Sequence, residues 1–87
     1  MVVTQDWEGF PQPVLAMNPV PFNNLLIHLE PVRIGHEAWM ATATIENPAN
    51  EETAPVALPR VHGTPRAAVE EILREACRRI RMDAWRN

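Results

Sequence analysis

One stretch near the C-terminus can form a long helix, and it constrains the fold of this 87-residue chain more than any other feature. Between Thr64 and about Met82, aliphatic residues recur at three- and four-residue intervals, which places them in one helical stripe. These residues are Val69, Ile72, Leu73, Ala76 and Ile80. Gly63, Thr64 and Pro65 predict the helix start, because Thr64 can cap free amides and Pro65 suits the first helical position. The stripe must pack on another layer.

Two runs upstream of this helix alternate with the period of a β-strand. The first run, residues 25–34, places three residues on one face: Leu25, Ile27 and Leu29. Pro31 interrupts this run, so we expect its continuation to be an edge segment or a bulged extension. The second run, residues 37–46, places four residues on the face that we expect in the core: Trp39, Ala41, Ala43 and Ile45. A turn at residues 34–36 predicts an antiparallel hairpin.

A third strand is predicted between this hairpin and the helix. Residues 47–55 contain Asn, Pro and acidic residues and predict a solvated loop. Residues 55–62 are weaker strand material, in which Pro59 indicates an edge position or a bulge. The predicted fold class is α+β, with a three-stranded antiparallel meander packed by one C-terminal α-helix. We assign this β-β-β-α domain to residues 25–87.

Residues 1–24 are rich in proline and in large apolar side chains. The prolines are Pro11, Pro13, Pro19 and Pro21, and the large apolar residues are Trp7, Phe10, Leu15, Met17 and Phe22. Proline at this density forbids a helix. We expect an extended arm that lies against its own domain or a partner subunit, with a short edge strand at residues 14–17. A flexible leader is the alternative.

The order of three strands and a helix over residues 25–82 resembles small bacterial domains of the HicB-like and double-stranded-RNA-binding-like folds. In both folds a three-stranded meander is followed by a helix. The resemblance is one of topology alone, so it assigns no functional residue to this chain.

Composition limits the classes of function. The formal net charge is −3, which argues against a protein whose main role is to grip phosphate backbones. Cys77 is the only cysteine, which excludes an intrachain disulfide and favours a reducing cytoplasm. No run approaches the roughly 18 apolar residues of a membrane span, and the N-terminus lacks the pattern of a signal peptide. We expect a cytoplasmic protein.

No side chain in this sequence indicates catalysis. His28, His36 and His62 do not have the spacing of metal ligands, and we expect them to be solvated or to cap turns. Cys77 lies in the middle of the predicted helix, where a structural role is favoured over a nucleophilic one. We therefore predict a protein that is not an enzyme, with no catalytic residue, metal or cofactor.

The arginines of the predicted helix are the candidates for nucleic-acid contact: Arg74, Arg78, Arg79 and Arg81. Acidic residues on the same helix, Glu70, Glu71 and Glu75, neutralise much of this charge. The spacing predicts the ion pairs Glu70–Arg74 and Glu75–Arg79. A solvated, internally paired face is therefore favoured over a nucleic-acid site.

Three tryptophans are many for one small core, and this favours association. We predict a non-enzymatic protein-interaction module that associates with itself or with another protein through the arm and a sheet edge. The candidate interface residues are Trp7, Phe10, Phe22 and Trp85, although Trp85 has the alternative of folding back onto the core. A nucleic-acid-binding accessory domain is the alternative function. No membrane or small-molecule partner is inferred.

Overall fold

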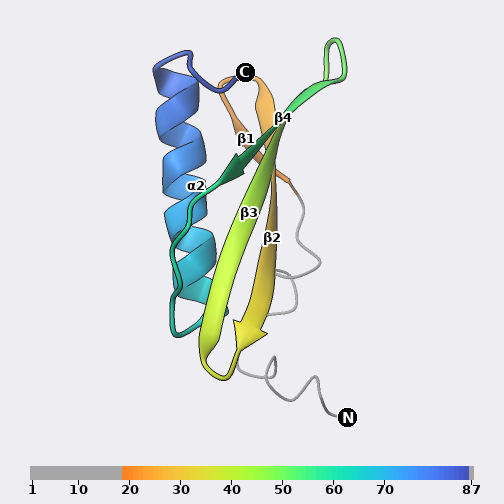
Figure 1. Ribbon diagram of the computed structural model, residues 1–87. Helices are drawn as coiled ribbons and strands as arrows, with labels where there is room; N and C mark the ends of the chain where they lie inside the picture. Colours follow the sequence, from red (N-terminus) through yellow and green to blue (C-terminus); the bar gives the residue numbers. More distant parts are fainter. Residues whose placement is uncertain (1–18, 87) are drawn as a thin grey trace.

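The computed structural model describes residues 19–86. The elements follow in the order β1 (Val20–Phe22), β2 (Leu25–Gly35), β3 (Ala38–Asn47), β4 (Glu52–Ala57) and α2 (Pro65–Arg81). The strands form one antiparallel sheet in the order β1-β2-β3-β4, and α2 covers one face of it (Figure 1). The α+β class is confirmed, but the sheet has four strands instead of the predicted three.

The additional strand is β1, which lies inside the segment that we assigned to the arm. A two-residue turn, Asn23–Asn24, joins β1 to β2, and both asparagines have positive φ angles, 52° and 66°. This is the backbone of a type I′ turn, which asparagine tolerates better than most residues. We missed β1 because it has three residues and contains Pro21. The edge strand predicted at residues 14–17 lies outside the described residues.

Strand β2 continues through Pro31 and is distorted only near its end. The register with β3 shifts between Arg33 and Gly35, which marks a bulge, as predicted for the part of the run after the proline. The turn that follows is formed by His36 and Glu37, slightly later than predicted. Glu37, and not a glycine, takes the positive φ angle of this turn, 51°.

Strand β4 begins earlier than predicted, so the expected loop at 47–55 is reduced to a tight turn at 48–51. Side chains stabilise this turn locally: the amide oxygens of Asn47 and Asn50 accept backbone N–H groups at 3.0 and 2.9 Å. After β4 the chain crosses to the helix through residues 58–64. Within this crossing, His62 forms an isolated antiparallel bridge with Trp39.

Helix α2 begins where its capping residues predict. The Thr64 hydroxyl accepts the N–H of Ala67 at 3.1 Å, and Pro65 is the first helical residue. The core lies between α2 and the sheet, and Trp39 is buried in it, as expected. The buried apolar residues are Leu25, Ile27, Leu29, Trp39, Ala41, Ala43, Ile45, Ala54, Val56, Ala68, Val69, Ile72, Ala76, Ile80 and Trp85.

The chain reverses after α2 and returns Trp85 to the core. Asp83 has a positive φ angle of 54°, and its N–H donates to the carbonyl of Ile80 at 3.0 Å. Trp85 is only 4% exposed. Arg86 lies 4.5 Å from the centre of the Trp85 ring and donates to Glu52 at 3.1 Å. These contacts tie the C-terminal tail to β4.

Candidate interaction surfaces

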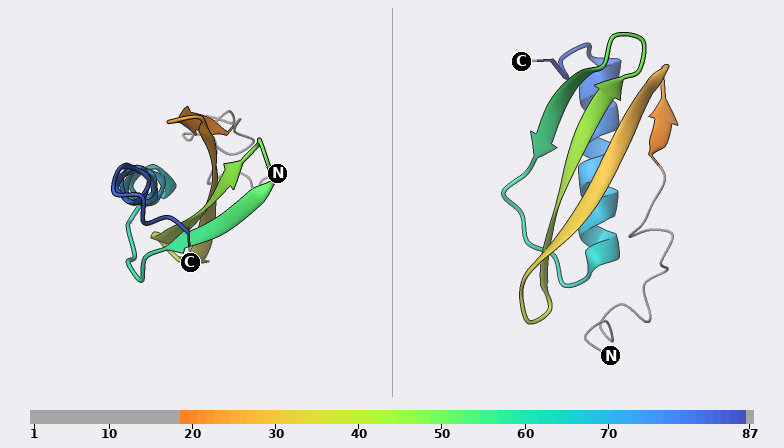
Figure 2. Two further views of the ribbon diagram at one scale, coloured as in Figure 1. Left: turned by 90° about the horizontal axis from the view of Figure 1, so that it is seen from above. Right: turned by 90° about the vertical axis from the view of Figure 1, so that its right-hand side faces the viewer.

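The face of the sheet opposite α2 is covered by no element within residues 19–86 (Figure 2). Val32 of β2 pairs with Met40 of β3 on this face. Trp39 and His62 form an antiparallel bridge, so Met40 lies opposite Val61, the residue before His62. Val32 and Val61 are 39% and 57% exposed, and Met40 is half-buried. We call Val32, Met40 and Val61 the apolar row.

The centre of this face is polar, and Leu26, Pro55 and Ala57 are further apolar residues on it. His28 and Glu46 lie on it and contact each other at 2.7 Å. Thr44 pairs with His28, and the exposed pair Glu30 and Thr42 lies between His28 and the apolar row. The apolar row therefore occupies the end of the face near the β2–β3 turn. Ile34, at the bulge beside this end, is 50% exposed.

Prolines occupy outward positions on the open edges of the sheet. In an antiparallel ladder, successive residues turn their backbone groups to opposite sides. Trp39 exchanges two hydrogen bonds of 2.8 Å with His62, so odd-numbered residues of β3 turn toward β4 and even-numbered ones toward β2. Pro31 lies opposite an odd-numbered residue of β3, and Pro55 opposite an even-numbered one. Both prolines therefore face away from β3.

The same alternation turns Pro21 away from β2, because its partner Leu26 is bonded to β3. One proline thus replaces an outward N–H donor on each open edge. These edges are the outer side of β1, the outer side of β4 and the part of β2 that extends beyond β1. A missing donor in the middle of an edge opposes the addition of another strand. This arrangement disfavours the sheet edges as docking sites.

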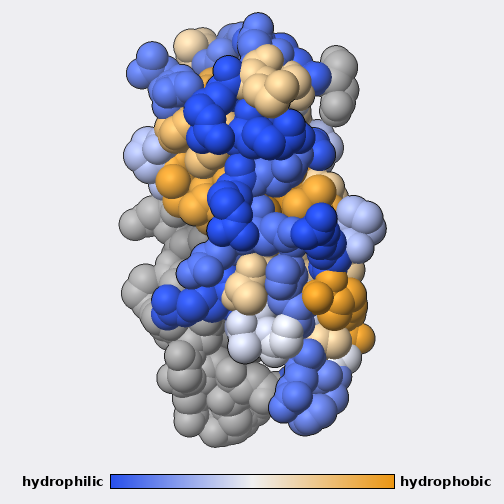
Figure 3. All heavy atoms as spheres, turned by 90° about the vertical axis from the view of Figure 1, so that its left-hand side faces the viewer, coloured by the Kyte–Doolittle hydropathy of each residue, from blue (hydrophilic) through white to orange (hydrophobic). Residues whose placement is uncertain are grey.

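A groove of about 390 Å³ lies between the crossing segment and α2. Its lining has four arginines and two glutamates around one apolar residue: Arg60, Arg74, Arg78, Arg81, Glu71, Glu75 and Leu58. We call this the arginine groove. It brings together Arg74, Arg78 and Arg81 of the predicted cluster, and Arg79 is not part of its lining. Hydrophilic residues dominate this helix side of the molecule (Figure 3).

The ion pairs around the groove differ from those predicted. Glu75 does pair with Arg79, at 2.7 Å, but it also accepts two bonds from Arg78. These two arginines hold the pKa of Glu75 at about 2, well below its ordinary value. The predicted ion pair between Glu70 and Arg74 is not formed.

Glu71 turns away from the helix arginines and holds the crossing segment. One carboxylate oxygen contacts His62 Nε2 at 2.5 Å, and the other accepts Arg60 Nη1 at 2.7 Å. The hydrogen bond with His62, followed by the charge of Arg60, lowers the pKa of Glu71. Sequence spacing could not reveal these partners, because they come from outside the helix.

The three histidines do not converge. His28 pairs with Glu46 on the outer sheet face, His36 lies in the β2–β3 turn, and His62 is tied to Glu71. Among residues 19–86 there is no group of three or more His, Cys, Asp or Glu side chains that could hold a metal ion. Cys77 is half-buried, and burial raises the pKa of its thiol.

A second hollow, of about 260 Å³, lies beside the β2–β3 turn. It is lined by Arg33, His36, Glu37, Trp39, Gly63, Thr64 and Pro65. The Thr64 hydroxyl caps α2, and the Arg33 guanidinium lies 6.0 Å from the centre of the Trp39 ring. Both groups therefore have structural partners, and this hollow presents no assembled reactive group.

The predicted interface residues are not brought together on one described surface. Trp7 and Phe10 lie outside the described residues. Phe22 is half-buried against the core, and Trp85 is buried within it. Trp85 thus follows the alternative in which it folds back onto the core. The apolar row, Val32, Met40 and Val61, carries only a weak signal in the sequence. Val61 joins this row through the irregular register between β3 and the crossing segment.

Comparisons with known proteins return no relative: no protein-family model, no curated protein and no solved structure matches this chain. The topological resemblance to HicB-like and double-stranded-RNA-binding-like domains therefore remains without support from a match. Within residues 19–86, no helix is long and apolar enough to cross a membrane.

Proposed function

We propose that this protein is a non-enzymatic interaction module that pairs with a second copy of itself through the outer face of its sheet. The observation that carries the proposal is the apolar row, Val32, Met40 and Val61, on a face that no described element covers. Burial of apolar surface contributes about 25 cal/mol per Å², so the exposed row favours a partner that removes it from water.

A second copy fits this face because the row is complementary to itself. A two-fold axis that runs along β3 through Met40 sets Val32 of each copy over Val61 of the other. Met40 then lies at the centre, where its adaptable thioether fills gaps between the two sheets.

The size of the face predicts a weak dimer. Strands of about ten residues at 3.3 Å per residue and four strands at about 4.8 Å spacing give at most about 600 Å² per copy. A standard interface buries about 800 Å² per partner. We therefore expect a dissociation constant in the micromolar range. The two copies should pack face to face, because the edge prolines oppose pairing of strands between copies. The single cysteine supports a cytoplasmic location for this dimer.

Sedimentation equilibrium of the full chain from about 1 μM to about 1 mM tests the proposal. The wild-type mass should rise toward that of a dimer. The variant Val32→Thr/Val61→Thr keeps the β-branched shape but adds hydroxyls, and its dissociation constant should be at least about tenfold higher.

Met82→Ser is the matched control, because Met82 is an exposed apolar residue at the end of α2, away from the outer sheet face. This variant should dimerise like the wild type. A wild-type protein that stays monomeric over the whole range would refute the proposal. So would a dimer that Val32→Thr/Val61→Thr leaves unchanged.

A further inference from the structure

The arginine groove carries positive charge that its own acids do not neutralise. Glu71 is occupied by Arg60 and His62, and Glu75 by two arginines of the helix. Arg74 and Arg81 form no ion pair with any residue of the described part of the chain. Both side chains line the groove and are exposed. Two guanidinium groups are thus available to an external anion.

We propose that this groove binds an acidic segment of another polypeptide, with carboxylates on Arg74 and Arg81. These residues are seven apart on α2, so their Cα atoms are separated by about 10.5 Å along the axis. A single small anion does not span that distance, whereas two carboxylates on one peptide do. The guanidinium fork matches a carboxylate in a bidentate geometry, which favours this ligand chemistry.

Leu58 and Arg78 add specificity to the site. Leu58 is the apolar residue of the groove and is half-buried, so it offers contact to one apolar side chain between the two carboxylates. Arg78 is held by two bonds to Glu75, at 2.6 and 3.0 Å, and its fixed position adds positive potential to the middle of the groove. The fitting segment therefore has acidic residues at both ends and an apolar residue between them.

A polypeptide fits this site better than a nucleic acid does. The chain has a net charge of −3, which repels a long polyanion outside the groove. No aromatic side chain lines the groove, so bases would find no stacking partner. Of the four arginines in the groove, Arg60 and Arg78 are bonded to Glu71 and Glu75, so few groups remain for contacts with a phosphate backbone.

The test uses the full chain and an eight-residue peptide with two glutamates at each end and leucines in the middle. We expect the peptide to shift the Nε–H NMR signals of Arg74 and Arg81. The variant Arg74→Gln/Arg81→Gln should weaken binding at least tenfold, and added salt should weaken binding to the wild type. A peptide with glutamine in place of glutamate should bind at least tenfold more weakly.

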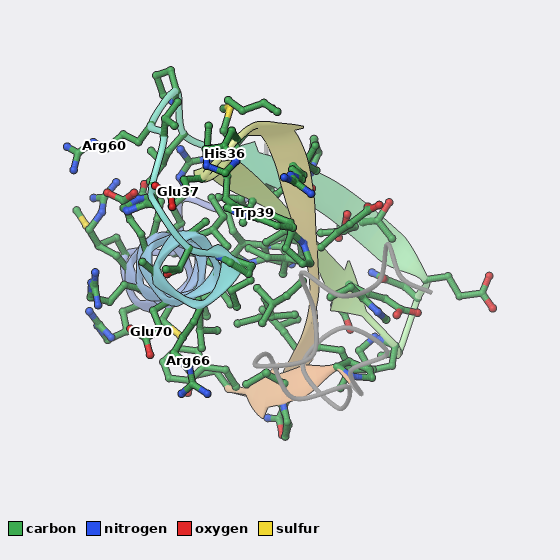
Figure 4. The ribbon with its side chains drawn as sticks, turned by 90° about the horizontal axis from the view of Figure 1, so that it is seen from below. His36, Glu37, Trp39, Arg60, Arg66 and Glu70 are labelled. Carbon is green, nitrogen blue, oxygen red and sulfur yellow. The ribbon has the colours of Figure 1, made fainter. Side chains whose placement is uncertain are left out.

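Arg66→Gln is the matched control. Arg66 is an exposed arginine of α2 without an ion pair among residues 19–86, but it lies outside the groove lining, on a different side of the helix from Arg60 (Figure 4). Its replacement should leave peptide affinity within about twofold.

Three results would overturn the proposal. The first is that the peptide does not bind at all. The second is that Arg66→Gln weakens peptide binding as much as the double variant does. The third is tighter binding of an eight-nucleotide single strand to the same arginines, which would make the groove a nucleic-acid site. The inference does not rest on dimerisation, because Arg74 and Arg81 are residues of α2, which covers the face of the sheet opposite the apolar row (Figure 2).

Discussion

Replacement of Glu37 by glycine should stabilise the protein, although glycine usually destabilises. Glu37 has a φ angle of 51° in the β2–β3 turn. The left-handed conformation costs an L-residue about 1–2 kcal/mol, and glycine adopts it freely. Against this gain stands the larger backbone entropy of glycine in the unfolded chain, about 0.5–1 kcal/mol. The contact between His36 and Glu37 spans 3.8 Å between two exposed side chains and contributes almost nothing.

The balance predicts that Glu37→Gly raises the free energy of unfolding by about 0.5–1 kcal/mol. In a chain of this size, this corresponds to an increase in Tm of about 2–8 °C. Thermal and urea unfolding can be followed by circular dichroism and by the fluorescence of the buried residues Trp39 and Trp85.

His36→Gly is the control, because His36 is the neighbouring turn residue and its φ angle is not positive. It should lower the free energy of unfolding by about 0.5–1 kcal/mol. Two glycine variants that change stability in the same direction would refute the reasoning from the backbone angle.

Three further predictions concern the core, the ion pairs and the sheet edge. Trp85→Ala should lower the free energy of unfolding in urea by about 3–5 kcal/mol, and a loss below 1 kcal/mol would show that Trp85 does not stabilise the core. Glu75 has a lowered pKa of about 2, so its pairs stabilise the fold at pH values above the ordinary value of 4.5 and lose this effect as pH falls toward 2. The deficit of Glu75→Gln, about 1 kcal/mol at pH 7 after solvent screening, should therefore vanish near pH 2, and a deficit that persists there would contradict this assignment. Pro55→Val restores an outward N–H on β4 and should accelerate fibril formation measured by thioflavin fluorescence, whereas Thr53→Val, which adds no donor to the same edge, should have a smaller effect.

Local signals in the sequence predict local structure well here. The start of α2 follows from Thr64 and Pro65, since a cap acts within one turn of the chain. The core face of β3 follows from strict alternation around Trp39. The strand β1 also had a local signal, the turn Asn23–Asn24, but the strand has only three residues and contains Pro21.

Features that depend on distant segments could not be predicted. Glu71 was expected only to neutralise the arginines of its own helix, yet the fold brings Arg60 and His62 to it. The apolar row likewise depends on the register between β3 and the crossing segment. Since β4 ends before that segment, its pairing cannot be extrapolated from the β3–β4 hairpin.

The crossing segment between β4 and α2 also has a consequence for how the folded molecule opens. Residues 58–64 have few backbone bonds to the sheet, the main ones being those of His62 with Trp39, and a single carboxylate, that of Glu71, holds two of their side chains. Amides protected by so few contacts exchange through local fluctuations instead of global unfolding. The amide hydrogens of residues 58–64 should therefore exchange with solvent before those of the central strands do. Protonation of Glu71 should make this segment the first part of the molecule to open.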